Sequence, residues 1–167
     1  RAGAVPECHF QLHFAKLTQA GGIEQRPACG VGLARKAPVP ATDHAPHRSE
    51  EKNVEFGAAA SGMVGFETAF SLVLSELVDS GALTLKKALE KLTVNPAKIL
   101  NIKKGVLKAG WDADITIIDP KAEWTVDVNK FSSKSKNSPF HGFTLKGKVL
   151  YTIVGGKIVV KDGKLAV

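Results

Sequence analysis

Hydrophobic side chains change from a helical to a strand-like period near Asn101, and this change limits the folds that the chain can adopt. Between residues 65 and 78 the apolar positions follow i, i+3, i+4, i+7, i+8 and i+11, which predicts a helix with one buried face. Gly81 should end this helix. A second helix is expected from Thr84, a favourable N-cap residue, and a third over residues 96–100, which begins with a proline.

Beyond Asn101 apolar and polar side chains alternate, which predicts strands. The clearest signal is Gly155-Gly156 between two apolar segments, because consecutive glycines suit a tight hairpin turn with positive φ. Turns are also expected at residues 110–112 and at Asp162-Gly163. The expected strands are residues 105–110, 113–119, 148–154, 157–160 and 165–167.

The composition divides the chain into three parts. Residues 1–38 hold both cysteines and several glycines and prolines, and we leave them unassigned and irregular, apart from a short helix expected over residues 8–18. Residues 39–101 open with a short apolar segment and continue with the helices. Residues 102–167 are expected to form a small β-rich unit. This order of elements predicts an α/β protein.

Charge and composition exclude several classes of protein. The net charge is +7, but the lysines are scattered over residues 86–164 without interleaved aromatic residues, so we expect solvated faces and no nucleic-acid partner. No apolar run approaches the roughly 20 residues of a membrane span, so no membrane partner is expected. Cys8 and Cys29 form no C-x-x-C pair, which indicates free thiols and a cytoplasmic location.

The segment Ala41-Thr-Asp-His-Ala-Pro-His47 places a carboxylate and two imidazoles within five residues. We expect a strand to end at Asp43 and a loop to occupy residues 48–62. In α/β barrels catalytic groups lie where strands end and loops begin. A carboxylate at such a position can ligate a metal or take a proton from water. Pro46 stiffens the loop, so His47 should have a defined direction.

Several further blocks appear in one order along residues 41–167. Thr42 to His47 is followed by Glu50-Glu-Lys52, Ser61 to Ala69, Leu92 to Lys98, Gly110 to Asp119, Lys134 to Phe140 and Thr152 to Ile158. Together these blocks resemble the barrel-type bacterial dihydroorotases of the amidohydrolase superfamily. The resemblance implies the C-terminal fragment of a (β/α)8 metal-dependent hydrolase barrel (a TIM barrel), with its last βα part in residues 39–101. It also implies that residues 102–167 belong to a composite β-sandwich.

The resemblance also implies a reaction and roles for four residues. The reaction is the reversible hydrolysis of the cyclic amide of dihydroorotate to N-carbamoyl-aspartate in pyrimidine biosynthesis. Asp43 would bind the metal and act as general base on water, and would return the proton to the leaving nitrogen. His47 would contact the substrate carboxylate. The backbone of Ser61 and Gly62 would contact the substrate ring. His44 is expected to be a structural histidine, and His141 should lie away from the chemistry.

The chain departs from the family pattern in its metal ligands. The family holds one or two zinc ions with a His-x-His pair and further histidines, and this sequence has no His-x-His. His9 and His13 have i, i+4 spacing but no third ligand nearby. We therefore expect the chain alone to retain at most trace zinc and to be inactive. Two alternatives stay open: a non-catalytic scaffold that binds aspartate carbamoyltransferase, and another cyclic amidase such as a hydantoinase or allantoinase. His47 favours dihydroorotase over the latter. The assembly, a homodimer or a complex with aspartate carbamoyltransferase, also stays open.

Overall fold

The structure is a computed structural model that describes residues 10–11, 38–55 and 57–166. Strand β1 (Phe10–Gln11) pairs in parallel with β2 (Pro40–Ala41). The expected helix over residues 8–18, the pair His9 and His13, and the two cysteines lie outside the described residues. Among the residues described, no helix is long and apolar enough to cross a membrane.

Three helices follow the motif, close to where the sequence predicts them. The first is α3 (Phe66–Val73), which continues as the π-helical turn η1 (Leu74–Val78) before the chain turns at Gly81 with φ of 74°. The second is α4 (Leu85–Leu92), and the Thr84 side chain caps it by accepting the Lys87 backbone N–H. The third, α5 (Val94–Ile99), begins two residues before the predicted Pro96. A proline is tolerated throughout the first turn, so its position did not fix the start.

The loop expected over residues 48–62 is not irregular throughout. It contains the short helix α2 (Ser49–Lys52), preceded by Arg48 in an extended conformation. Glu51 accepts a hydrogen bond from the Arg48 backbone N–H at 3.0 Å, which satisfies a donor at the start of the helix. Single-sequence periodicity cannot detect a helix of four residues, because it spans barely one turn.

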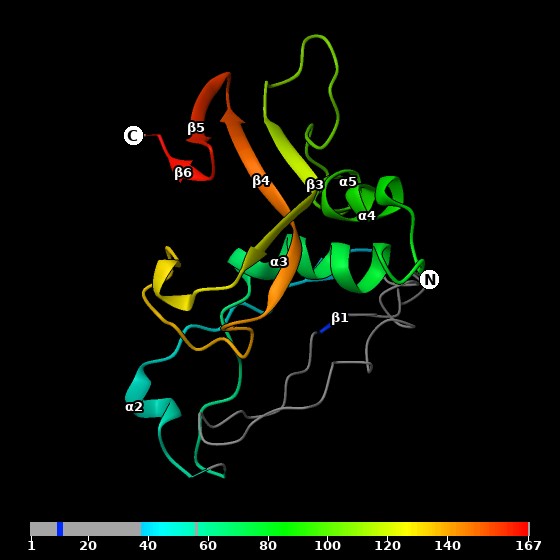
Figure 1. The fold of residues 1–167 in the computed structure, drawn as a ribbon. Coiled ribbons are helices and arrows are strands. Elements are labelled where there is room, and N and C mark those ends of the chain that lie inside the picture. Colours follow the sequence, from blue (N-terminus) through cyan, green and yellow to red (C-terminus); the bar gives the residue numbers. More distant parts are fainter. Residues whose placement is uncertain (1–9, 12–37, 56, 167) are drawn as a thin grey trace.

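The second half of the chain is a four-stranded antiparallel sheet in sequence order (Figure 1). Its strands are β3 (Ile115–Thr125), β4 (Thr144–Val154), β5 (Lys157–Lys161) and β6 (Lys164–Leu165). The hairpin at Gly155-Gly156 is confirmed, with φ of 54° and 79° at the two glycines. The 3-10 turn η2 (Val128–Lys130) lies between β3 and β4.

The strand predicted over residues 105–110 is wrong. Gly105 and Gly110 both have positive φ, and the segment between them pairs with no strand among the described residues. A Cβ on Gly105 would lie 2.7 Å from the Thr93 carbonyl oxygen, so the chain here packs closely on the start of α5. The apolar residues between the two glycines were typical of a strand, but Gly105 serves a close approach to Thr93 instead.

One hydrophobic core joins the helical segment to the sheet. It is a cluster of seven buried residues from both halves: Met63, Val64, Leu72, Val126, Phe131, Phe140 and Leu145. At the contact between α3 and β4, a Cβ on Gly147 would lie 2.3 Å from Leu74 Cδ1, so only glycine lets the strand approach. The Trp124 indole N–H lies 3.0 Å from Ser71 Oγ and 3.1 Å from the Gly147 carbonyl oxygen. A smaller cluster of Val73, Leu77 and Ala88 holds α4 on η1.

Candidate active site

Asp43 is the second residue after β2, and it is exposed. Its φ of 46° lies in the left-handed region, which aspartate tolerates better than most residues. The chain then forms a parallel bridge between His44 and Met63, and the Ala45 N–H donates to the Met63 carbonyl at 2.9 Å. The segment after β2 therefore lies alongside Met63.

His44 has a structural role, as predicted. Its Nδ1 accepts hydrogen bonds from the backbone N–H groups of Gly65 at 3.1 Å and Phe66 at 3.4 Å, where α3 begins. Those donors have no partner within the helix, so the imidazole takes the place of an N-cap side chain. The ring also stacks on Phe66, with centroids 3.9 Å apart and planes 5° from parallel. A nitrogen that accepts two N–H groups is not available as a ligand.

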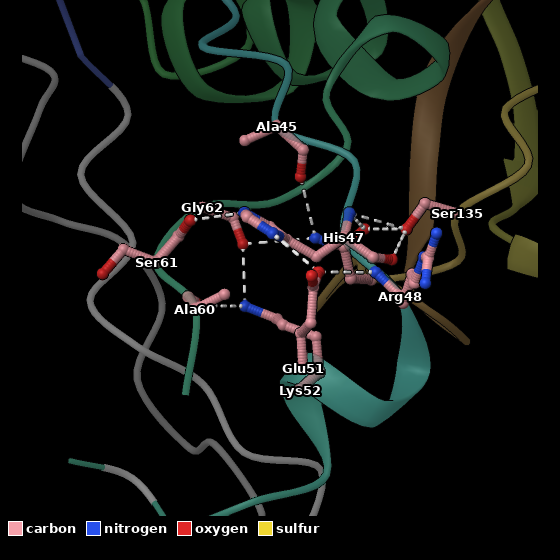
Figure 2. Close-up of polar contacts among 10 residues, drawn as sticks. Ala45, His47, Arg48, Glu51, Lys52, Ala60, Ser61, Gly62 and Ser135 are labelled. Carbon is pink, nitrogen blue, oxygen red and sulfur yellow. Dashed lines mark hydrogen bonds and ion pairs between the residues drawn. The ribbon is translucent and has the colours of Figure 1, made fainter. Parts of the chain in front are cut away.

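His47 is held on both sides by groups distant in sequence (Figure 2). Its Nε2 lies 2.8 Å from the Ser61 carbonyl oxygen, and its Nδ1 lies 3.3 Å from a carboxylate oxygen of Glu51. Its backbone N–H donates to Ser135 Oγ at 3.1 Å, and the Ser135 hydroxyl donates in turn to the His47 carbonyl. The Ser61 carbonyl and the Glu51 carboxylate can only accept, so the ring donates to both when each of its nitrogens carries a proton.

The structure brings three of the four predicted site residues together: His47, Ser61 and Gly62. Gly62 has φ of 108°, and a Cβ there would lie 2.5 Å from Ala45 Cβ. The Asn137 side-chain amide donates to the carbonyls of Ala45 at 3.0 Å and Gly62 at 3.3 Å, so it ties both loops to one another. Asp43 adjoins this group through the His44–Met63 bridge.

The sequence did not identify Lys52 as a site residue. Its side chain is 7% exposed, and its Nζ donates to the carbonyls of Ala60 at 2.7 Å and Gly62 at 2.9 Å. Burial lowers the pKa of this lysine, because it disfavours the charged form. Its neighbour Glu51 has a pKa held below the usual range, chiefly by the Arg48 backbone N–H and further by His47.

A pocket of about 680 Å³ opens beside His47, between α2 and residues 134–137. Arg48, Lys134 and Lys136 contribute positive charge to its lining, whereas Glu50 and Glu51 contribute negative charge. The Lys136 ammonium is occupied by the carbonyls of Phe131 and Ser133, each at 2.9 Å. His141 lies elsewhere, as predicted, with its Nδ1 accepting the Val128 backbone N–H at 3.3 Å.

The described residues were also tested for a metal site. No three His, Cys, Asp or Glu side chains in the described ranges converge on one point. A zinc hydrolase needs about three protein ligands with an open position. Asp43 is an exposed carboxylate, whereas His44 Nδ1 is committed to α3. These residues by themselves therefore do not fit a catalytic metal.

The Amidohydrolase family model matches residues 39–159. Among curated proteins, the dihydroorotase of Acetivibrio thermocellus is 61% identical over 122 residues, which cover 73% of this chain and 29% of that protein. The dihydroorotase of Geobacter metallireducens is 58% identical over 121 residues, 72% of this chain and 28% of that protein. The chain thus spans less than a third of the length of these relatives.

Solved structures agree on the fold. The L-hydantoinase (dihydropyrimidinase) of Arthrobacter aurescens superposes with a TM-score of 0.73 at 33% identity, covering 81% of this chain and 31% of that one. A D-hydantoinase of Thermus sp. gives 0.72 at 25% identity, with the same coverage. The α/β segment with its antiparallel sheet is therefore a recurring part of larger hydrolases with this architecture.

Proposed function

Because the chain belongs to the Amidohydrolase family, we propose that it forms part of a dihydroorotase, which hydrolyses the cyclic amide of dihydroorotate to N-carbamoyl-aspartate. The observation that carries the proposal is the high identity to proteins of that name, 50–61% in eight of them, against 22–33% to solved hydantoinases. The assembly of His47 with Ser61 and Gly62 supports it independently, because it places a directed imidazole beside a backbone surface.

In this proposal Asp43 handles the proton. Hydrolysis of an amide needs water to lose a proton as it attacks the carbonyl, and the departing nitrogen needs to gain one. An exposed carboxylate close to a strand end can do both in turn, so that no net proton is consumed.

His47 would orient the substrate through its carboxylate. Of its two ring contacts, the one with Glu51 is longer and lies on the exposed side, where the two side chains are 25% and 52% exposed. A substrate carboxylate could replace the Glu51 carboxylate at Nδ1 without disturbing the 2.8 Å contact with Ser61. Arg48 and Lys134 in the mixed-charge lining of the neighbouring pocket would attract an anionic substrate.

The proposed function also includes a bound metal ion. Asp43 would supply one oxygen ligand to a zinc site whose other ligands come from outside the described residues. No catalytic step is assigned to the metal, since the described side chains do not hold it.

The test is a graft. Residues 39–159 replace the matching segment of the Acetivibrio thermocellus dihydroorotase, and turnover of dihydroorotate is measured beside the unaltered enzyme. We expect turnover within about tenfold of the parent, because most of the contacts are shared. A folded graft that hydrolyses hydantoin or dihydropyrimidine but not dihydroorotate would instead assign the chain to the cyclic amidases of the hydantoinase type.

A further inference from the structure

We propose that Lys52 is a positioning residue, which holds the backbone of residues 60–62 so that the Ser61 carbonyl fixes the His47 ring. Lysine is rarely buried in proteins unless it is paired, yet the Lys52 side chain is 7% exposed. Its effect on catalysis rests on the proposed function, whereas its effect on the loop does not.

The partners of the Lys52 ammonium are informative. In the described contacts they are two backbone carbonyls, those of Ala60 and Gly62, and no carboxylate. The carbonyl between them, that of Ser61, lies 2.8 Å from His47 Nε2. The Lys52 ammonium and the His47 imidazole therefore hold three successive carbonyls of this loop. Figure 2 shows these contacts.

The short helix α2 carries residues that contact the His47 ring and the loop of residues 60–62. His47 lies just before it, Glu51 contacts the His47 ring from it, and Lys52 ends it. The Gly62 carbonyl receives a second donor from Asn137, which also binds the Ala45 carbonyl. The loop of residues 60–62 is thus held by an ammonium from α2 and by an amide from the segment before β4.

Loss of the Lys52 ammonium has a specific consequence. Two half-buried carbonyls lose a charge-assisted hydrogen bond, and the loop keeps the Asn137 amide at the Gly62 carbonyl and the hydrogen bond from the Ala60 N–H to the Glu51 carbonyl at 3.1 Å. The Ser61 carbonyl between them is then less constrained, so the His47 ring gains rotational freedom. Since His47 contributes binding in the ground and transition states alike, KM for dihydroorotate should rise more than kcat falls.

The first experiment uses the unaltered chain and needs no activity. In ¹⁵N,¹³C-labelled protein at low temperature, scalar couplings across the hydrogen bonds should connect Lys52 Nζ with the carbonyl carbons of Ala60 and Gly62. Absence of both couplings, with the Lys52 ammonium freely rotating, would overturn the proposal whatever the enzyme's substrate.

The second experiment compares Lys52→Met, Lys52→Arg and the matched control Lys157→Met, which removes an exposed lysine on β5. In Lys52→Met we expect amide exchange at residues 60–63 to accelerate by about tenfold or more and the His47 ring resonances to move, while β4 amides keep their protection. Lys52→Arg should restore part of the amide protection and part of the ring resonance positions, and Lys157→Met should change neither quantity. Unchanged exchange and ring signals in a folded Lys52→Met overturn the proposal. If Lys52→Met does not fold, the scalar couplings in the unaltered chain and the Lys52→Arg variant decide whether the proposal holds.

The kinetic arm uses the graft described above. Lys52→Met should raise KM for dihydroorotate about tenfold, with kcat within about threefold, and Lys52→Arg should recover part of KM. A fall in kcat alone would contradict a positioning role through His47. A graft without any turnover would reject the proposed function, whereas the couplings in the isolated chain would still test the role of Lys52.

Discussion

The two histidines of the motif show how three residues of separation can change a side chain's task. His44 uses Nδ1 as an acceptor for two amides of α3, which commits the ring to the fold. His47 holds Nε2 against the Ser61 carbonyl and presents Nδ1 towards Glu51 and the pocket side. Only the second ring can exchange a partner for a substrate without uncapping a helix.

Asp43 and His47 should therefore fail in different ways when substituted in the graft. Asp43→Asn keeps the shape and removes the basicity, so kcat should fall by roughly 10²-fold or more. His47→Ala removes a bond to a charged group, which is worth about 1.5–3 kcal/mol, and should mainly raise KM. Steady-state kinetics at pH 8, with metal content checked in both variants, separates the two effects. Near-parental kcat in Asp43→Asn would reject this motif as the catalytic centre.

Gly62 gives a test of loop geometry that does not depend on activity. Gly62→Ala would combine φ of 108° with a Cβ 2.5 Å from Ala45 Cβ, a methyl group that cannot rotate away. We expect a loss of about 1–3 kcal/mol in the free energy of unfolding, measured by urea denaturation. Gly57→Ala is the matched control, because nothing lies within 4 Å of its Cβ position and its φ is not positive. Equal stability of both variants would contradict the packing of residues 45 and 62.

The sequence predicted the residues that resemble a family motif, but not those that hold them. His47, Ser61 and Gly62 were predicted to serve one site, and the structure places them in contact. Lys52 was assigned to a solvated loop, because a single lysine in a polar run carries no sign of burial. Asn137 lies 92 residues from Ala45, so only the tertiary fold shows that they meet.

At the level of elements, local signals succeeded where one residue type fixes the backbone. Thr84 capped its helix as expected, and Gly155-Gly156 formed the hairpin. The local sequence pattern gave a wrong strand prediction where a glycine makes a close tertiary contact, as Gly105 does with Thr93. The π-helical turn η1 was also not predicted, because its period over five residues is too close to that of an α-helix.

An exposed ion-pair cluster links the loop before β3 to the β4–β5 hairpin. Lys104 Nζ lies 2.7 Å from Asp112 and also pairs with Asp114, whose other oxygen accepts the Gly155 N–H at 2.8 Å. The hydrogen bonds that Lys104 donates to Asp112 and Asp114 raise its pKa. Lys104 and the Gly155 N–H lower the pKa of Asp114. The cluster is therefore charged throughout the neutral range.

These shifts predict how the cluster responds to pH. A lowered carboxyl pKa contributes stability that is present above about pH 4 and is lost as pH falls through the folded-state value. A raised lysine pKa contributes stability that is present below about pH 10 and is lost as pH rises through the folded-state value. Lys104→Met should thus lower the urea midpoint at pH 7 and flatten its fall between pH 5 and pH 3. The effect should shrink in 1 M salt. An acid limb as steep as that of the parent chain would contradict the role of this cluster.

At the scale of the whole molecule, the buried core crosses the boundary that composition suggested near residue 101. Leu72 on α3 belongs to the same cluster as Val126, Phe140 and Leu145, which lie in or beside β3 and β4. The Trp124 indole reaches Ser71 on α3 as well. The sequence predicted the helices and the sheet separately, but it could not show that they bury one another, since that depends on which faces meet.

A shared core predicts that helices and sheet unfold together. Leu72→Ala should cost about 2–5 kcal/mol of unfolding free energy, because Leu72 is 6% exposed and its removal leaves a cavity between α3 and the sheet. In a Trp111→Phe background, fluorescence reports Trp124 on β3, and circular dichroism at 222 nm reports the helices. Both transitions should coincide and shift by the same amount. Leu165→Ala, at a residue 71% exposed on β6, should shift neither by more than about 0.5 kcal/mol. If Leu72→Ala moved the helical transition and left that of Trp124 in place, the helices and the sheet would be separate folding units.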